Sequence, residues 1–194
     1  VFVHGSAGHT PNRLYTEDAM RQLGLPVASD WADVGQQLDA SNLSYLSLAH
    51  FCSPLEELMQ LRPLLGLRSP VNTLSRMLNP LNARASLQSI FHPAYARLHQ
   101  EADRILGQPS AVVFKGDSGE TEVKPQADTR LYQLHNRELT QRLLPRSIVK
   151  RVEAVTTPDA HCIKALWRGD TEDYYGLQAT LATTAAALLV LRPD

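Results

Sequence analysis

The sequence predicts an α/β domain in which a mainly parallel sheet is flanked by helices. Strand-like apolar segments alternate with helix-like segments of roughly 10–15 residues, and the run at 111–114 is apolar throughout. Such a run is typical of a parallel strand whose two faces are both covered by helices. The chain has 194 residues, enough for one full hydrophobic core. We therefore expect a single domain over residues 1–194.

The first part of the chain predicts strands at 1–4 and 43–48. Thr16 and Ser29 are typical N-cap residues, and Gly24 is typical of a helix end. The segment Ser53-Pro54-Leu55-Glu56 resembles a capping box with proline at the first helical position. Four helices are therefore expected, at 17–23, 30–38, 54–65 and 70–79.

The second part predicts strands at 86–90 and 111–114 and a helix from Pro93 to Leu106, which Gly107 ends. A polar loop follows at 115–125. The segment 130–143 could form one strand, two strands or part of a helix. Two further helices are expected, at 159–168 and 171–191.

Composition narrows the class of protein. The hydrophobic content is 43% and the charged content 20%, as in ordinary globular proteins. We expect no membrane contact, because the longest apolar run, 179–191, is shorter than a span and is interrupted by threonines. The start of the chain has no secretory signal pattern, and Cys52 and Cys162 are far apart. These features favour a cytoplasmic protein.

The basic residues are unevenly distributed, although the net charge is only −1. Segment 58–100 contains no acid but five arginines, and segment 130–151 contains six basic residues and one acid. Arginine makes bidentate contacts with phosphate and stacks on bases. The pattern fits either a basic patch or arginines dispersed over several helix surfaces.

Three local patterns could bind a ligand. Gly5 follows a predicted strand and allows close approach of a ligand to the backbone, while His4 can donate a hydrogen bond. Arg62 could clamp a carboxylate or phosphate, or could lie along the surface. The acids of loop 115–122 could hold Mg²⁺ or form an ordinary acidic turn.

Several segments, in order, match one family pattern. Segment 61–80 reads L-R-P-L-L-G-L-R-S-P-V-N-T-L-S-R-M-L-N-P, similar to R-x-x-L-G-x-R-T-x-F-N-x-L-G-P-L-x-N-P. Val3-His4-Gly5 looks like K-H-G, and 106–122 is similar to L-G-x-x-x-A-x-V-x-H-G-x-D-G-x-D-E. The chain thus resembles the anthranilate phosphoribosyltransferase-like family, glycosyl transferase family 3.

The resemblance implies the large α/β domain of an anthranilate-phosphoribosyltransferase or nucleoside-phosphorylase-like fold. In that family a helical domain and a Gly-rich phosphate loop precede the K-H-G strand. The chain begins at Val1 in a predicted strand, without an initiator methionine. We therefore expect both parts to be missing upstream, and a homodimer formed through the missing helical domain.

The resemblance also implies roles for particular residues. His4 and Gly5 would line the substrate pocket, and Arg62 would contact the anthranilate. Val3 replaces the family lysine. The Asp-Glu pair that holds Mg²⁺ corresponds to Thr121-Glu122, so that only Glu122 remains as a metal ligand.

These departures resemble the YbiB-like nucleic-acid-binding branch of the family. We expect a protein without normal anthranilate phosphoribosyltransferase activity that binds single-stranded nucleic acid, DNA or RNA, through Arg62, Arg68, Arg76, Arg84 and Lys115. One alternative is an active transferase that uses phosphoribosyl diphosphate, an aromatic acceptor and Mg²⁺. Another is a small-molecule sensor or scaffold that uses the remaining pocket.

Overall fold

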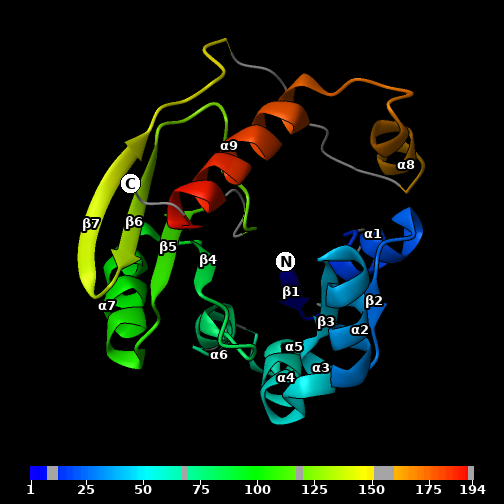
Figure 1. The fold of residues 1–194 in the computed structure, drawn as a ribbon, viewed down its shortest axis with the longest axis horizontal. Helices are drawn as coiled ribbons and strands as arrows, with labels where there is room; N and C mark the ends of the chain where they lie inside the picture. The colour runs from blue at the N-terminus through cyan, green and yellow to red at the C-terminus, as the bar shows by residue number, and fades with distance from the viewer. Residues whose placement is uncertain (8–12, 67–69, 117–119, 151–159, 192–194) are drawn as a thin grey trace. The chain divides into compact units, whose positions relative to one another are not determined.

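A computed structural model describes residues 1–7, 13–66, 70–116, 120–150 and 160–191 (Figure 1). Its contacts divide the chain into two compact units, each described here by itself. Unit 1 contains Val1–Asn72 and Val155–Glu172, and unit 2 contains Thr73–Ala154 and Asp173–Asp194. The expectation of a single domain over 1–194 stays a prediction.

Unit 1 is built on a parallel sheet with strand order β1-β3-β2. The strands are β1 (Phe2–Gly5), β2 (Val27–Ala28) and β3 (Ser44–Ser47), and both β1 and β2 pair with β3. Helices α1 (Thr16–Leu23) and α2 (Trp31–Ser41) form the connections. The core joins α2 to the sheet, and its buried members are Ala28, Val34 and Leu46.

The helix starts differ by one residue from those expected. Asp30, not Ser29, is the N-cap of α2, and its carboxylate accepts a hydrogen bond from Asp33 N at 2.8 Å. Ser29 N instead donates to the Asp33 carboxylate at 3.0 Å. Thr16 lies inside α1, whose N-cap position is Tyr15 without a side-chain cap. Gly24 ends α1 in the left-handed conformation, as expected.

The helix expected over 54–65 is two helices, α4 (Ser53–Gln60) and α5 (Arg62–Leu65), which follow the short α3 (Leu48–Phe51). Pro63 of α5 has no N–H to donate to the preceding turn, which explains the break between the two helices. The capping box is also wrong, because no side chain caps α4 and Glu56 instead accepts from Ser6 Oγ at 2.8 Å. Gly66 ends α5 at φ 68°. Unit 1 also includes α8 (Ala160–Arg168), which packs on α1.

Unit 2 contains a four-stranded sheet of order β4-β5-β6-β7. Before it the chain forms α6 (Val71–Leu74), which spans the boundary between the units, and the 3-10 turn η1 (Ser75–Met77). The remaining elements of unit 2 are β4 (Ala85–Ile90), η2 (Pro93–Tyr95), α7 (Ala96–Leu106), β5 (Ser110–Lys115), β6 (Thr129–His135), β7 (Glu138–Leu144) and α9 (Tyr174–Leu191). Strands β4 and β5 are parallel, and the later pairs are antiparallel. Across the described chain, three strand pairs are parallel and two antiparallel. This agrees with the predicted α/β class.

Strand β5 is covered on both faces, as its apolar run predicted. Val112 and Phe114 pack with Ala186 and Val190 of α9. Val113, pointing the other way, packs with Ile90 and Ala96 beside α7. Helices α7 and α9 therefore cover opposite faces of this sheet (Figure 1).

The undecided segment 130–143 belongs to two strands that form a hairpin. Its two-residue turn is Asn136-Arg137, with φ values of 46° and 71°. Positive φ at both central residues is typical of the type I′ turn, which matches the twist of paired strands. Arginine is unusual at such a position, so the sequence carries no strong turn signal there.

Helix α9 covers most of the helix expected over 171–191 and begins three residues later, at Tyr174. Its 18 residues are long and apolar enough to cross a membrane by length and composition, with mean hydropathy 1.3. The same test is passed by core helices of water-soluble proteins. In unit 2, α9 packs on the sheet through Ala186 and Val190, and Tyr175 and Ala179 pack with Ile148.

Candidate functional site

His4 and Gly5, which the sequence predicts to line a substrate pocket, end strand β1 in unit 1, and that role stays a prediction. The His4 ring lies edge-on to Phe51, with 5.6 Å between ring centroids. A Cβ on Gly5 would lie 3.3 Å from Tyr45 Oη, so glycine favours the close packing of β1 on this side chain. Burial raises the pKa of Tyr45 above its usual range, which keeps the hydroxyl neutral.

Arg62 is the first residue of α5, and its side chain is exposed. Within the described ranges, its guanidinium has no hydrogen-bond partner. It is therefore accessible, and its two expected roles, in the substrate pocket and in nucleic-acid binding, stay predictions. Arg68 lies outside the described residues.

Arg76 and Arg84 lie at opposite ends of β4. Arg76 is half-buried, and its Nη1 donates to the Ser89 hydroxyl at 2.8 Å and to the Ser89 carbonyl at 3.2 Å. Arg84 precedes the strand, and its Nη2 donates to the Leu191 carbonyl of α9 at 3.1 Å. Arg84 and Ser89, the partner of Arg76, are five residues apart along the strand, or about 17 Å. The structure therefore does not bring these two arginines together.

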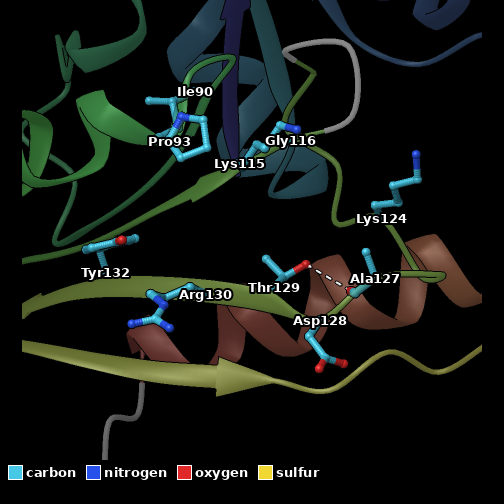
Figure 2. Close-up of a pocket in the computed structure, with 10 residues that line it drawn as sticks. All are labelled: Ile90, Pro93, Lys115, Gly116, Lys124, Ala127, Asp128, Thr129, Arg130 and Tyr132. Atoms are coloured by element: carbon cyan, nitrogen blue, oxygen red, sulfur yellow. Dashed lines mark hydrogen bonds between the residues drawn. The ribbon is translucent and has the colours of Figure 1, made fainter.

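The last expected residue, Lys115, is exposed at the end of β5 and lines a cavity of about 280 Å³ (Figure 2). The cavity lies where the parallel strands β4 and β5 end and the antiparallel strand β6 begins. Ligand sites in α/β proteins are commonly found at the carboxyl ends of parallel strands. Its lining consists of Ile90, Pro93, Lys115, Gly116, Lys124, Ala127, Asp128, Thr129, Arg130 and Tyr132.

The cavity lining is positively charged. Lys115 comes from β5, Lys124 from the following loop and Arg130 from β6, and all three are exposed. Asp128 is the acid of the lining, so three positive charges and one negative charge give a formal charge of +2. Asp128 Oδ1 accepts a hydrogen bond from Arg146 N at 3.0 Å, which holds the carboxylate toward the end of β7. The arrangement favours an anionic ligand.

An aromatic side chain forms one wall of the cavity. Tyr132 is half-buried and packs against Ile90, Ala96 and Val113. The Arg130 side chain comes from the same strand, two residues earlier, and its Nη1 donates to Gln141 Oε1 at 3.3 Å. Figure 2 shows both residues on β6, below the end of β5. A ring beside cations can contact a nucleobase while the cations contact phosphate.

Gly116 shapes the loop that follows β5. A Cβ at this position would lie 1.7 Å from the Glu120 carbonyl oxygen, a distance no side chain can adopt. The Gly116 N–H donates to the Ile90 carbonyl at 3.2 Å, which extends the β4–β5 pairing by one bond. A side chain at this position would displace the Glu120 backbone, so this close approach requires glycine.

Glu122, the expected metal ligand, follows Thr121 in this loop. Thr121 Oγ1 donates to the Ser89 hydroxyl at 3.4 Å, and the next residue, Val123, donates its N–H to Thr183 Oγ1 at 2.9 Å. The described part of the chain contains no group of three or more His, Cys, Asp or Glu side chains placed to hold a metal ion. The role of Glu122 as a ligand stays a prediction.

Lys124, Arg130 and Tyr132 were not predicted from the sequence as site residues. Two features of the sequence pointed toward this region: Lys124 belongs to the polar loop 115–125 after the buried strand, and Arg130 begins the basic segment 130–151. Neither signal shows that these residues lie near Lys115. That depends on β6 pairing antiparallel with β5, which places Tyr132 opposite Val113.

Comparison with known proteins gives a family match over most of the chain. The family described as "Glycosyl transferase family, a/b domain" matches residues 13–193. An anthranilate phosphoribosyltransferase of Novosphingobium aromaticivorans is 27% identical over 89% of this chain and 54% of its own length. One from Desulfatibacillum aliphaticivorans is 26% identical over 93% of this chain and 51% of its own length.

A third relative carries a different name. The Escherichia coli protein YbiB, described as uncharacterized, is 28% identical over 65% of this chain and 39% of its own length. The chain spans about half the length of the anthranilate phosphoribosyltransferases above.

Proposed function

Since this chain belongs to the glycosyl transferase family defined by that α/β domain, we propose that it binds single-stranded nucleic acid without sequence preference. We further propose that it lacks normal anthranilate phosphoribosyltransferase activity. The observation that carries the proposal is the cavity at the end of β5, lined by Lys115, Lys124 and Arg130.

The chemistry of this cavity suits a nucleic-acid backbone. Lysine and arginine at the surface neutralise phosphates and release condensed counterions, which gives affinity without reading sequence. The Tyr132 wall offers an aromatic side chain to a base, as in other single-strand binders. The cavity volume of about 280 Å³ is close to the lower end of the ~300–1,000 Å³ range of small-molecule sites, a size that suits one unpaired nucleotide better than a duplex.

The arginines expected from the sequence have different parts in this proposal. Arg62 is exposed, and with Arg68 it remains a candidate for extending the contact along the strand. Arg76 is half-buried and donates to the Ser89 hydroxyl, and neither residue belongs to the cavity lining. Arg84 lies at the other end of β4 and is held by Leu191, so it is the weakest candidate.

The proposed loss of transferase activity is supported by the loop after β5. The position that carries an aspartate in the resembling enzymes holds Thr121, whose hydroxyl is bonded to Ser89. A metal that bridges a diphosphate depends on anionic oxygen ligands. A hydroxyl in place of a carboxylate weakens that chemistry.

The test is the anisotropy of a fluorescent single-stranded oligonucleotide, measured with the full-length protein at ~50 and ~200 mM salt. Three phosphate contacts predict affinity about 20-fold weaker at the higher salt. Lys115→Gln, Lys124→Gln and Arg130→Gln should each weaken binding and reduce the salt dependence by about one phosphate contact. The control is Arg104→Gln on α7, which removes a cation paired with Glu101. Absence of binding at low salt removes the proposal.

A second candidate is an active phosphoribosyl or glycosyl transferase that uses phosphoribosyl diphosphate and an aromatic acceptor. The relatives named anthranilate phosphoribosyltransferase favour it, as do the retained His4, Gly5 and Arg62. It requires Mg²⁺-dependent consumption of phosphoribosyl diphosphate by the full-length protein when aromatic acceptors are supplied. Consumption that also falls in the Arg62→Gln variant would favour this candidate over the first.

A further inference from the structure

Three ring side chains follow directly after β4 in unit 2. They are Phe91, His92 and Tyr95, and all three residues are exposed. Neighbouring rings meet edge-on, with centroids 4.8 Å apart for Phe91 and His92 and 6.1 Å apart for His92 and Tyr95. Single exposed apolar residues are ordinary, whereas a contiguous exposed group marks a binding surface. We refer to these three residues as the aromatic cluster.

The aromatic cluster adjoins the basic cavity. Ile90 immediately precedes Phe91, and Pro93 lies between His92 and Tyr95 in the chain. Both Ile90 and Pro93 line the cavity (Figure 2). Consecutive Cα atoms are about 3.8 Å apart, so each residue of the cluster is one or two such steps from the cavity wall. A ligand that extends out of the cavity on this side meets the exposed rings.

The backbone that carries the cluster is held in place by local structure. The 3-10 turn η2 begins at Pro93, whose ring restricts φ, and Tyr95 N donates to the His92 carbonyl at 3.0 Å across the turn. Tyr95 leads into Ala96, which is fully buried at the start of α7. Rings on such a fixed turn lose less conformational entropy on binding than rings on a flexible loop.

Two cations of the cavity lie on the same face of the sheet. Val113 of β5 is paired with Tyr132 of β6, and both pack with Ile90. Side chains alternate along a strand, so Lys115 and Arg130, each two residues from that pair, share this face. Both cations are exposed and belong to the cavity lining. Positive charge and exposed rings therefore adjoin within unit 2.

This combination matches the repeating chemistry of a single nucleic-acid strand. Phosphates alternate with bases along such a strand, and each base has an aromatic face that stacks on a ring. Segment 58–100, which contains the cluster, has no acid that would repel the phosphates. An apolar protein segment could cover the rings, but it would provide no anion for Lys115 and Arg130. The nearby cations thus favour nucleic acid as the occupant.

We propose that the aromatic cluster is a stacking platform for unpaired bases, while Lys115 and Arg130 hold phosphate in the adjoining cavity. The inference rests on the proposed function, because it extends the same binding site beyond the cavity. Tyr132 contacts a base inside the cavity, and the aromatic cluster stacks the neighbouring bases outside it. Since every base has an aromatic face, the platform adds affinity without sequence preference.

The first experiment compares two single strands of equal length and charge, an oligothymidylate and an abasic strand that has the phosphates and sugars but no bases. Fluorescence anisotropy with the full-length protein measures both affinities at one salt concentration. The wild type is expected to bind oligothymidylate at least about tenfold more tightly. Combined Phe91→Ala and Tyr95→Ala substitutions should weaken oligothymidylate binding at least about fivefold and change binding of the abasic strand less than about twofold.

Tyr174→Ala is the matched control, because Tyr174 is an exposed tyrosine on α9, which covers the opposite face of the sheet. This variant is expected to bind both strands as the wild type does. Thermal melting monitors the folding of each variant. Should the double variant not fold, Tyr95→Leu replaces it, since leucine keeps apolar bulk without an aromatic face. The same selective loss for oligothymidylate is expected there.

Each outcome decides between the two proposals. Wild-type affinity of the folded variant for both strands overturns the inference and leaves the proposed function standing. An equal loss for both strands also overturns it, because the cluster then acts through the phosphates or through the fold. Absence of binding to either strand by the wild type at low salt removes the proposed function and the inference together.

A second measurement detects stacking directly. Tyr95→Trp adds an indole at the cluster to Trp31 and Trp167, the two tryptophans of the chain. Oligothymidylate is expected to quench the emission of this variant more than that of the wild type, whereas the abasic strand should give no additional quenching. Equal quenching of the variant and the wild type by bound oligothymidylate contradicts stacking at this position.

Discussion

A chain of buried polar side chains joins β4 to α7. Gln88, His99 and Asp103 are each at most 2% exposed. The Gln88 amide nitrogen donates to both Asp103 oxygens, at 2.9 and 3.0 Å. Its amide oxygen, 2.9 Å from His99 Nδ1, must therefore accept, so the neutral imidazole carries its proton on Nδ1. The orientation of Gln88 thus sets the tautomer of His99.

These hydrogen-bonded side chains make the stability of unit 2 depend on pH. Burial raises the pKa of Asp103 to about 6, although the hydrogen bond from Gln88 acts in the opposite direction. The folded state thus holds this proton more tightly than the unfolded state, and stability falls as the pH rises from ~4 to ~6. Burial and then Arg76 lower the pKa of His99, so its contribution falls as the pH drops below ~6.5.

Asp103→Asn is expected to remove the pH dependence of stability that is due to Asp103 and to keep the one that is due to His99. Relative to the wild type, the variant should gain about 2 kcal/mol between pH 4 and pH 7, because it never buries a carboxylate charge. Urea unfolding of both proteins at the two pH values measures the difference. A stability difference that does not change with pH would show that Asp103 does not titrate in this range.

At the scale of elements, the β6–β7 hairpin supports one side of the cavity. Arg130 and Tyr132 lie on β6, which pairs with β5 on one side and with β7 on the other, and β6 and β7 reverse at Asn136-Arg137. Arg137 has φ 71°, which is costly for a residue with a Cβ. The turn is therefore stabilised by the pairing of β6 with β7, which runs from Thr129 opposite Leu144 to His135 opposite Glu138. The conformational preferences of the turn residues do not stabilise it.

Arg137→Gly is expected to stabilise the protein by roughly 0.5–1 kcal/mol, because relief of the left-handed strain exceeds the added freedom of the unfolded chain. Chemical denaturation measures this change. Arg142→Gly serves as the matched control within β7, where glycine should destabilise. A loss of stability at position 137 would mean that the side chain contributes more than its backbone conformation costs.

At the scale of the whole molecule, the net charge of the protein and the charge of the cavity lining have opposite signs. The sequence pI is about 6.7 and the net charge −1, yet the cavity lining has a formal charge of +2. Attraction of a polyanion then depends on the local patch, because at physiological ionic strength charges beyond ~8 Å are largely screened. The rest of the surface neither helps nor prevents binding.

Oligonucleotide affinity is therefore expected to change less than about threefold between pH 6 and pH 8, since Lys and Arg stay charged across this range. The net charge of the protein changes sign over the same interval, because its pI is about 6.7. Anisotropy at constant ionic strength is the measurement. An affinity that follows the net charge, disappearing above the pI, would contradict binding at a local basic site.

Much of the architecture could be predicted from local sequence. The alternation of segments and the apolar run of β5 predicted the α/β class. Burial of one or both faces of an element determines the spacing of apolar residues along the sequence. Gly24 and Gly107 were predicted to end helices, and both have positive φ values, 70° and 79°. Predictions of helix starts were less accurate. Ser29 and Asp30 are both good caps, and only the hydrogen bond from Asp33 N to the Asp30 carboxylate identifies the N-cap.

The basic character of the chain was likewise a property of the sequence, but the location of the candidate site was not. Arg76 and Arg84 are near neighbours in the chain and lie at opposite ends of β4, whereas Lys115, Lys124 and Arg130 meet around one cavity. Residue type and period are local quantities that each segment carries by itself. Which side chains meet depends on strand direction and register, and those are determined by packing between segments distant in the sequence.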